Sequence, residues 1–161
     1  MANSFEIHAD EYESNKHFFL SHYFRDMYDQ SLKNLPVISS GINIDRIEVW
    51  VTNKNGNFTE SRNVVAFLDL AEGVTPTGTN IFNTSFVKYK GPGRYPSNTL
   101  NDLYDNLIAN YSGIRDIGQV TSVLTQLEAQ GFIGGQDYEK IENARRLTPE
   151  EYQLNAKLGY I

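Results

Sequence analysis

The fold class of this chain is decided by one stretch, Arg46-Ile-Glu-Val-Trp-Val-Thr-Asn-Lys-Asn-Gly-Asn-Phe-Thr-Glu-Ser-Arg-Asn-Val-Val-Ala-Phe-Leu-Asp-Leu70. Its first part alternates apolar and polar residues with the two-residue period of a strand, and one face carries Ile47, Val49 and Val51. Its last part, from Asn63 to Leu70, is apolar at nearly every position, which predicts a strand buried on both faces. The polar, Gly-containing segment between the two parts predicts a hairpin connection.

The start of the first strand is open to two interpretations. Ile42 and Ile44 have the opposite parity to Ile47, so they would point to the other face of one regular strand. Either the strand begins after Asp45, or a bulge at Asp45 and Arg46 restores the alternation.

Three helices are predicted around this pair of strands. The first runs from Ser14 or Asn15 to Leu35 with an aromatic stripe, although Asp10 and Glu13 could cap it one turn earlier. The second begins at residues 96–98, and its stripe is Leu100, Leu103, Tyr104, Leu107, Ile108 and Tyr111. The third spans 116–130, is closed by a glycine at 131, and has the stripe Ile117, Val120, Leu124 and Leu127.

We therefore expect an α+β fold with a small, mainly antiparallel sheet and about three helices, in a single soluble domain over residues 1–161. Residues 71–97 are rich in Gly, Thr, Asn and Pro and are predicted to form a long loop excursion, with one short strand around residues 86–89. Residues 138–147 could be helix or strand on their pattern alone, because the apolar positions are too sparse for a clear stripe.

Composition excludes several function classes. The formal net charge is −6, so the chain lacks the basic surface that nucleic acids and anionic membranes attract, and we expect no nucleic-acid partner. There is no Cys, which removes thiolate metal sites and cysteine nucleophiles. His17 and His22 are five residues apart, which does not match the spacing of a zinc helix, so no metal and no cofactor are expected.

No motif of catalysis is found either. The Gly-rich segments lack the context of a phosphate loop, and no nucleophile elbow is present, so we expect no enzyme and no catalytic residue. The N-terminus has no charged segment followed by an apolar run, so we expect no signal peptide in this stretch. A carbohydrate- or peptide-binding surface module is the alternative to a structural segment, and a cytoplasmic enzyme of unrecognised type is the third hypothesis.

Five residues are candidates for interaction. Arg46, Glu48 and Trp50 share one face of the first strand, and Arg62 and Asp69 could make polar contacts across the sheet. Trp50 is the chain's single tryptophan, and it would either pack inside the fold beside a cation or form an exposed platform for a sugar or protein. Packing is the favoured interpretation.

Many short segments, spread over most of the chain, resemble one known family. These segments are 15–20, 23–26, 34–36, 41–53, 56–57, 62–63 and 65–70, with further matches at 96–98, 103–104, 138–140, 144–145, 147, 151–152 and 158–161. In this order they resemble the SprA (Sov) family, while residues 71–95 and 112–135 match poorly.

The resemblance implies a setting for the chain. The family comprises very large outer-membrane β-barrel proteins that form the translocon of the type IX secretion system in gliding and related bacteria. It implies that this chain is a soluble, non-enzymatic segment of such a protein, periplasmic or extracellular, whose partners are the rest of its own barrel and other secretion-system proteins. It also implies that residues 136–161 are a strand-like return segment, so that 138–147 and the end from Leu158 onward are strands.

Overall fold

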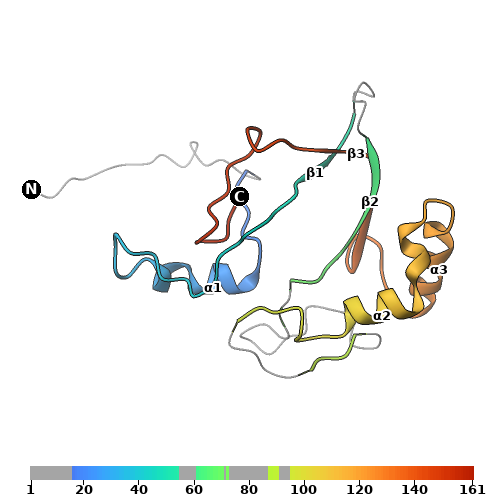
Figure 1. Ribbon diagram of the computed structural model, residues 1–161, viewed down its shortest axis with the longest axis horizontal. Helices are drawn as coiled ribbons and strands as arrows, with labels where there is room; N and C mark the ends of the chain where they lie inside the picture. Colours follow the sequence, from blue (N-terminus) through green and yellow to red (C-terminus); the bar gives the residue numbers. More distant parts are fainter. Residues whose placement is uncertain (1–15, 55–60, 71, 73–86, 91–94) are drawn as a thin grey trace, which may run out of the picture. The chain divides into compact units, whose positions relative to one another are not determined.

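The computed structural model describes residues 16–54, 61–70, 72, 87–90 and 95–161 (Figure 1). Contacts within the chain group it into two units, one made of Met1–Asn43 with Gln153–Ile161 and the other of Ile44–Tyr152. The expectation of a single domain over 1–161 stays a prediction. In the described residues, no helix is both long and apolar enough to cross a membrane.

The first unit contains helix α1 (His22–Ser31) and the end of the chain. The Ser21 hydroxyl accepts the Phe24 N–H at 3.4 Å, which caps the helix, and the Phe24 side chain is buried. Gly159 has a φ of +64°, and a Cβ atom there would overlap the Phe24 ring, so the chain end passes this helix with no room for a side chain.

Helix α1 is shorter at both ends than its pattern predicts. Phe18 and Ile161 exchange backbone hydrogen bonds of 2.8 and 3.0 Å, so the segment just before the helix pairs with the chain end and cannot be helical. After Ser31 the chain turns, and Leu35 is 66% exposed, so it does not extend the buried stripe. The helix is confirmed, but the bounds of Ser14 or Asn15 to Leu35 are wrong.

The second unit contains the sheet, whose strands are β1 (Trp50–Thr52), β2 (Arg62–Phe67) and β3 (Tyr138–Arg146). The strand order is β1-β3-β2, and both neighbouring pairs are antiparallel. The predicted hairpin is therefore wrong, because β3 lies between the two strands that are adjacent in the sequence. The expectation that β2 is buried on both faces is also wrong, since Ala66 on one of its faces is exposed.

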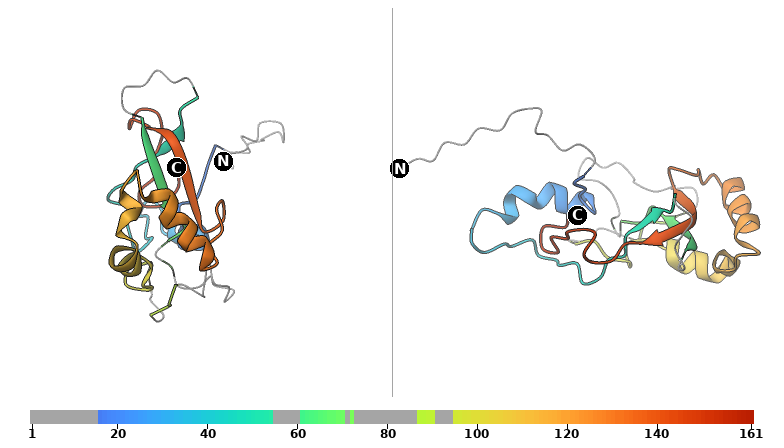
Figure 2. Two further views of the ribbon diagram at one scale, coloured as in Figure 1. Left: turned by 90° about the vertical axis from the view of Figure 1, so that its right-hand side faces the viewer. Right: turned by 90° about the horizontal axis from the view of Figure 1, so that it is seen from above.

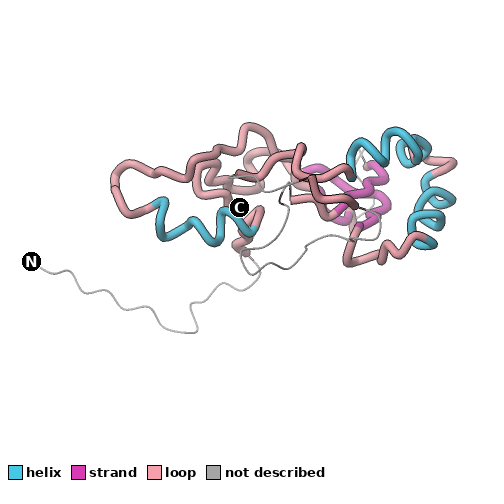
Figure 3. The backbone as a smooth tube through the Cα atoms, turned by 90° about the horizontal axis from the view of Figure 1, so that it is seen from below, coloured by secondary structure: helices cyan, strands magenta, loops and turns pink. Residues whose placement is uncertain are grey.

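Helices α2 (Leu103–Asn110) and α3 (Val120–Ala129), joined by the 3-10 helix η2 (Ser112–Arg115), lie on one side of the β2–β3 pair (Figure 1, Figure 2, Figure 3). Their buried residues form the core with Val87, Phe132 and Tyr138, and Val65 and Phe67 of β2 pack against it. This arrangement confirms the α+β class with three helices and a small antiparallel sheet.

The apolar stripes of these helices are confirmed in part. Leu103 and Leu107 of α2 are buried, as are Val120, Leu124 and Leu127 of α3, and Gly131 ends α3 with a φ of +95°. Two predicted stripe residues, Tyr104 and Ile117, are 60% and 78% exposed. Ile117 is excluded from the core because α3 begins three residues after it, so the predicted start at 116 is wrong.

Strand β3 contains a bulge that changes which residues share a face. Arg62 pairs with Ala144 and Val64 with Ile141, so one residue of β2 lies opposite two residues of β3. Asn143 in the bulge has a φ of +52°, which Asn tolerates better than other residues with a side chain, and its N–H donates to the Asn63 Oδ1 atom at 3.1 Å. The predicted bulge at Asp45 and Arg46 is not needed, because β1 begins only at Trp50.

Two further predictions concern the loop excursion over 71–97 and the strand-like return segment over 136–161. Most of 71–97 lies outside the described residues, and the part that is described includes an isolated bridge between Tyr89 and Asn101. The strand implied for residues 138–147 is confirmed over Tyr138–Arg146. From residue 147 onward the described residues form isolated bridges, Phe19 with Tyr160 and Asn155 with Tyr160, and no further strand.

Candidate binding site

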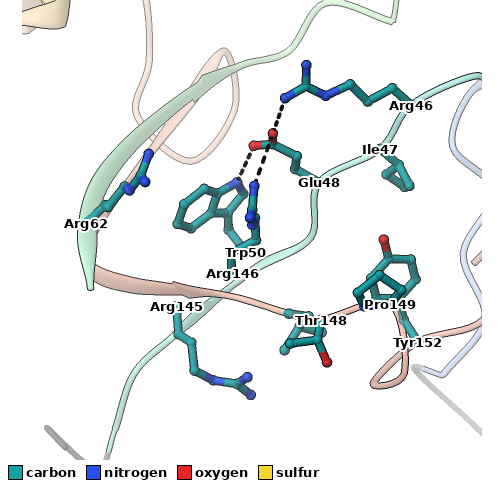
Figure 4. Close-up of a pocket in the computed structure, with 11 residues that line it drawn as sticks. Arg46, Ile47, Glu48, Trp50, Arg62, Arg145, Arg146, Thr148, Pro149 and Tyr152 are labelled. Atoms are coloured by element: carbon teal, nitrogen blue, oxygen red, sulfur yellow. Dashed lines mark hydrogen bonds and ion pairs between the residues drawn. The ribbon is translucent and has the colours of Figure 1, made fainter. Parts of the chain in front are cut away.

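A hollow of about 540 Å³ lies in the second unit, where β1 and β3 meet the segment that follows β3 (Figure 4). Its volume falls within the range of about 300–1,000 Å³ that is typical of ligand pockets. Its lining combines arginines, an acid, aromatic rings and aliphatic side chains: Arg46, Ile47, Glu48, Trp50, Arg62, Arg145, Arg146, Leu147, Thr148, Pro149 and Tyr152. All of these residues belong to the unit that contains the sheet.

The Glu48 carboxylate holds the centre of the hollow together. Its Oε1 atom is 2.6 Å from Nη2 of Arg46 and 3.5 Å from Nη1 of Arg146, and its Oε2 atom accepts the Trp50 indole N–H at 3.3 Å. Figure 4 shows these three contacts converging on the one carboxylate. The hydrogen bond from Arg46, with further stabilisation from Trp50 and Arg146, lowers the pKa of Glu48, so this group is ionised at neutral pH.

Strand register brings three of the hollow's residues to one face of the sheet. Trp50 lies directly opposite Arg146, and Arg62 pairs with Ala144, two residues before Arg146 on the same strand. Residues two apart on a strand share a face, so Arg62, Arg146 and Trp50 stand on the same side. Val65 and Phe67 pack on the helical core from β2, so by alternation Arg62 is on the opposite face, away from the helices.

The bulge in β3 is responsible for the position of Arg146. Tyr138 faces the core, and an unbroken alternation would place Arg146, eight residues later, on the same core face. The additional residue at the bulge reverses the alternation, so that Arg146 joins Trp50 on the open face. A bulge is a known means of redirecting a side chain at a functional position.

The Trp50 ring is flanked by a guanidinium group. The Cζ atom of Arg62 lies 5.8 Å from the centre of the ring, within the range of a cation–π interaction. Among the described residues, no carboxylate forms an ion pair with Arg62, whose closest described interaction is with the ring. Trp50 is half-buried in the hollow, so it packs beside a cation and also contributes to an accessible surface.

The rim of the hollow is fixed by a second ion pair. Arg145 Nη1 is 2.7 Å from Glu151 Oε2, and the same oxygen accepts the Thr148 N–H at 2.9 Å. The hydrogen bond from Arg145, together with the Thr148 N–H, lowers the pKa of Glu151 to about 2. The turn after β3 is therefore tied back to the strand, which keeps Thr148, Pro149 and Tyr152 at the edge of the hollow.

The hollow has an excess of positive charge although the chain is acidic. Among the described residues, four guanidinium groups and one carboxylate line it, and one of the four, that of Arg145, is paired with Glu151 at the rim. Glu48 serves both Arg46 and Arg146, and each guanidinium has five N–H donors, so donor capacity remains after these contacts. The arrangement can therefore accept an anionic group beside an aromatic and aliphatic surface.

Four of the five candidate residues come together in this hollow, namely Arg46, Glu48, Trp50 and Arg62. The fifth, Asp69, lies apart from it. Its Oδ1 atom accepts a hydrogen bond from Nδ2 of Asn101 at 3.0 Å, and the Asn101 Oδ1 atom accepts the Leu103 N–H at the start of α2. Asp69 thus connects the end of β2 to helix α2 and takes no part in the hollow.

Sequence reasoning missed the residues that β3 and the turn after it contribute, above all Arg145, Arg146 and Tyr152. The adjacent arginines at 145 and 146 were a visible signal, but a helix and a strand were both compatible with their segment. Only the position of β3 between β1 and β2 brings Arg146 opposite Trp50 and Arg145 to the rim. Within the described ranges, no three His, Asp or Glu side chains lie close enough together to hold a metal ion.

Comparison with known proteins places the whole chain in one family. No curated protein matches it. The family model SprA_N, described as motility related/secretion protein, matches residues 1–161. A match over the full length covers both units and every residue of the hollow, and the chain therefore belongs to the SprA_N family of motility-related secretion proteins.

Proposed function

We propose that this chain is a non-enzymatic interaction segment of a bacterial outer-membrane protein that serves type IX protein secretion and gliding motility. The observation that carries the proposal is the full-length match to a motility and secretion family. On this proposal the segment lies in the periplasm or outside the cell, and its partners are the rest of its own large β-barrel protein and other secretion-system proteins.

Three described groups with shifted pKa values behave as structural contacts and not as acid–base catalysts. General acid–base catalysis needs a group whose pKa lies near the working pH. The pKa values of Glu48 and Glu151 are lowered by their arginine partners, and a hydrogen bond to Glu128 raises the pKa of Tyr138 to about 12. Each of these shifts moves the group further from neutrality, as expected of structural ion pairs and hydrogen bonds.

The alternative function, a carbohydrate- or peptide-binding module, is addressed by the hollow itself. A sugar platform uses a broad aromatic face with Asn or Asp side chains beside it. The lining of the hollow places arginines beside Trp50 and, among the described residues, includes no Asn or Asp. Its charge and its aliphatic side chains favour the peptide version of this alternative, which is compatible with a segment of a secretion protein.

The location can be tested by labelling cysteines on intact cells. A single Cys replaces Ser112, an exposed residue of η2, in the full-length parent protein, and a membrane-impermeant maleimide is added. Labelling of intact cells would place the segment outside, and labelling only after the outer membrane is permeabilised would place it in the periplasm. Fractionation of the protein exclusively into the cytosol would overturn the proposal.

The interaction role can be tested with a photo-crosslinking amino acid in the same full-length protein. Position Thr148, exposed at the rim of the hollow, is compared with Arg115, an exposed residue of η2. We expect crosslinks to secretion-system proteins from Thr148 and fewer or none from Arg115. Equal crosslinking from both positions would show that the hollow is not a preferred contact surface.

A further inference from the structure

The cations around Trp50 outnumber the described acids that they contact. A fold that needed only to shield Trp50 could use aliphatic neighbours, whereas here Arg62 and Arg146 share its face and Arg46 meets it through Glu48. Like charges brought together on one face repel each other, which costs stability unless something neutralises them. Within the part of the chain that the structure describes, Glu48 is the only acid in the lining, and it cannot balance all of these cations.

We propose that this hollow binds a short acidic segment of a partner polypeptide, with its carboxylates on Arg62 and Arg146 and an apolar side chain against Trp50 and Tyr152. The inference names a partner chemistry for the proposed interaction segment, and it rests on that proposal only for its setting in the cell. Guanidinium groups suit this role because they pair with carboxylates through two parallel hydrogen bonds.

The hollow is already organised for such a guest. The Glu48 contacts hold Arg46, Arg146 and the indole N–H in position, and the Arg145–Glu151 pair fixes the turn that carries Pro149 and Tyr152. Side chains that are held before binding lose less conformational entropy when a partner arrives. Arginine and tryptophan are also the residues most enriched among the strong contributors to protein interfaces.

The mixed lining favours a peptide over other anions. Nucleic acid would need an extended basic surface, while the chain as a whole carries a net charge of −6 and would repel a long polyanion. Inorganic phosphate could use the guanidinium groups but has nothing to place against the aliphatic side chains of Ile47 and Leu147. An acidic peptide with one apolar residue uses both kinds of surface.

The chain supplies its own reporter for a binding test. Trp50 is its only tryptophan, so a change in tryptophan emission reports on this hollow alone. The probe is the acetylated and amidated peptide Glu-Glu-Leu-Glu-Glu, and its neutral counterpart is Gln-Gln-Leu-Gln-Gln. Both are titrated into the full 161-residue chain at low salt, beside inorganic phosphate and a short oligothymidylate at equal charge.

We expect the acidic peptide to change the Trp50 emission in a saturable way and the neutral peptide to have no effect. Arg62→Gln should weaken binding about tenfold, because a charge-assisted hydrogen bond is lost. Arg146→Gln should act in the same direction. Arg115→Gln, which removes an exposed arginine from η2 and leaves the hollow intact, is the matched control and should bind as the parent chain does.

Specific results would overturn the inference. Equal binding of the acidic and neutral peptides, or unchanged binding in Arg62→Gln, would show that the cations do not recognise carboxylates. If phosphate or oligothymidylate bound as tightly as the peptide at equal charge, the hollow would be a general anion site and not a peptide site. Circular dichroism of each variant reports whether it folds. If Arg146→Gln perturbs the sheet, the binding of Arg62→Gln alone tests whether the cations recognise carboxylates. Binding to the isolated chain and location on cells are measured separately, so the inference and the proposed function can fail independently.

Discussion

The Tyr138 hydroxyl donates a hydrogen bond of 2.6 Å to Glu128 Oε1 and so ties strand β3 to helix α3. Tyr138 itself is buried in the core of the second unit. The hydrogen bond to Glu128, with burial and the charges of Glu128 and Glu139 adding to it, raises the pKa of Tyr138 from 10.0 to about 12. The folded state therefore favours the neutral phenol.

A dependence on alkaline pH follows at this residue. Since the folded-state pKa is raised, the stabilisation is fully present below pH 10 and is lost as the pH rises from 10 to about 12. Tyr138→Phe should lower the free energy of unfolding by about 1 kcal/mol at pH 8, and the difference from the parent should shrink and disappear as the pH rises between 10 and about 12. Urea unfolding at a series of pH values measures both quantities.

Tyr104→Phe is the matched control for this experiment. It removes the same hydroxyl group from a side chain that is 60% exposed, so water replaces whatever the hydroxyl contacts. Its free energy of unfolding should match that of the parent chain at pH 8. A gap between the parent and Tyr138→Phe that stays constant from pH 8 to 12 would contradict the role of the hydroxyl.

At the scale of elements, the bulge in β3 determines which side chains reach the hollow. Asn143 holds a φ of +52°, a conformation that glycine adopts freely and that β-branched residues adopt only with strain. Asn143→Gly should keep the free energy of unfolding within a few tenths of a kcal/mol, while Asn143→Val should lower it by about 1–2 kcal/mol. Urea unfolding followed by Trp50 emission reads both the stability and the hollow.

The comparison of the two Asn143 variants contains its own control, because both lose the Asn side chain and only one strains the backbone. If valine and glycine at this position gave the same stability, the bulge would not depend on the left-handed conformation. If Asn143→Val were less stable yet kept the parent emission of Trp50, the bulge would be independent of the position of Arg146.

The elements themselves show what a single sequence can and cannot predict. Spacing located the buried side of α3, since Leu124 and Leu127 follow a helical period and both are buried. Alternation located the exposed polar face of the β1 region, where Arg46 and Glu48 are exposed. These are local properties, and local patterns determine them.

Strand order is not a local property. The pattern of residues 46–70 shows two strands but contains no sign that Tyr138–Arg146 pairs between them. That pairing links residues as far apart in the chain as Phe67 with Tyr138 and Trp50 with Arg146. The error in strand order caused the error in the site. Arg46, Glu48, Trp50 and Arg62 were found on the two visible strands, whereas Arg145 and Arg146 come from the strand whose place could not be predicted.

At the scale of the whole molecule, the net negative charge of the chain opposes the attraction between an acidic peptide and the arginines of the hollow. The net charge of −6 at pH 7 repels an acidic peptide over long distances, while the arginines attract it at close range. Glutamates of the peptide, with a pKa of about 4.3, are ionised at pH 7.

At about 0.01 M salt, where charges interact over roughly 30 Å, the net charge of the whole chain opposes the binding of Glu-Glu-Leu-Glu-Glu. Raising the salt to about 0.1 M, where charges interact over roughly 10 Å, should therefore raise the affinity measured by titration of the Trp50 emission. The affinity should fall again at about 1 M salt, where screening confines electrostatics to roughly 3 Å and weakens the arginine contacts as well. An affinity that falls steadily from about 0.01 to about 1 M salt would mean that the groups within the hollow, and not the charge of the whole chain, control binding.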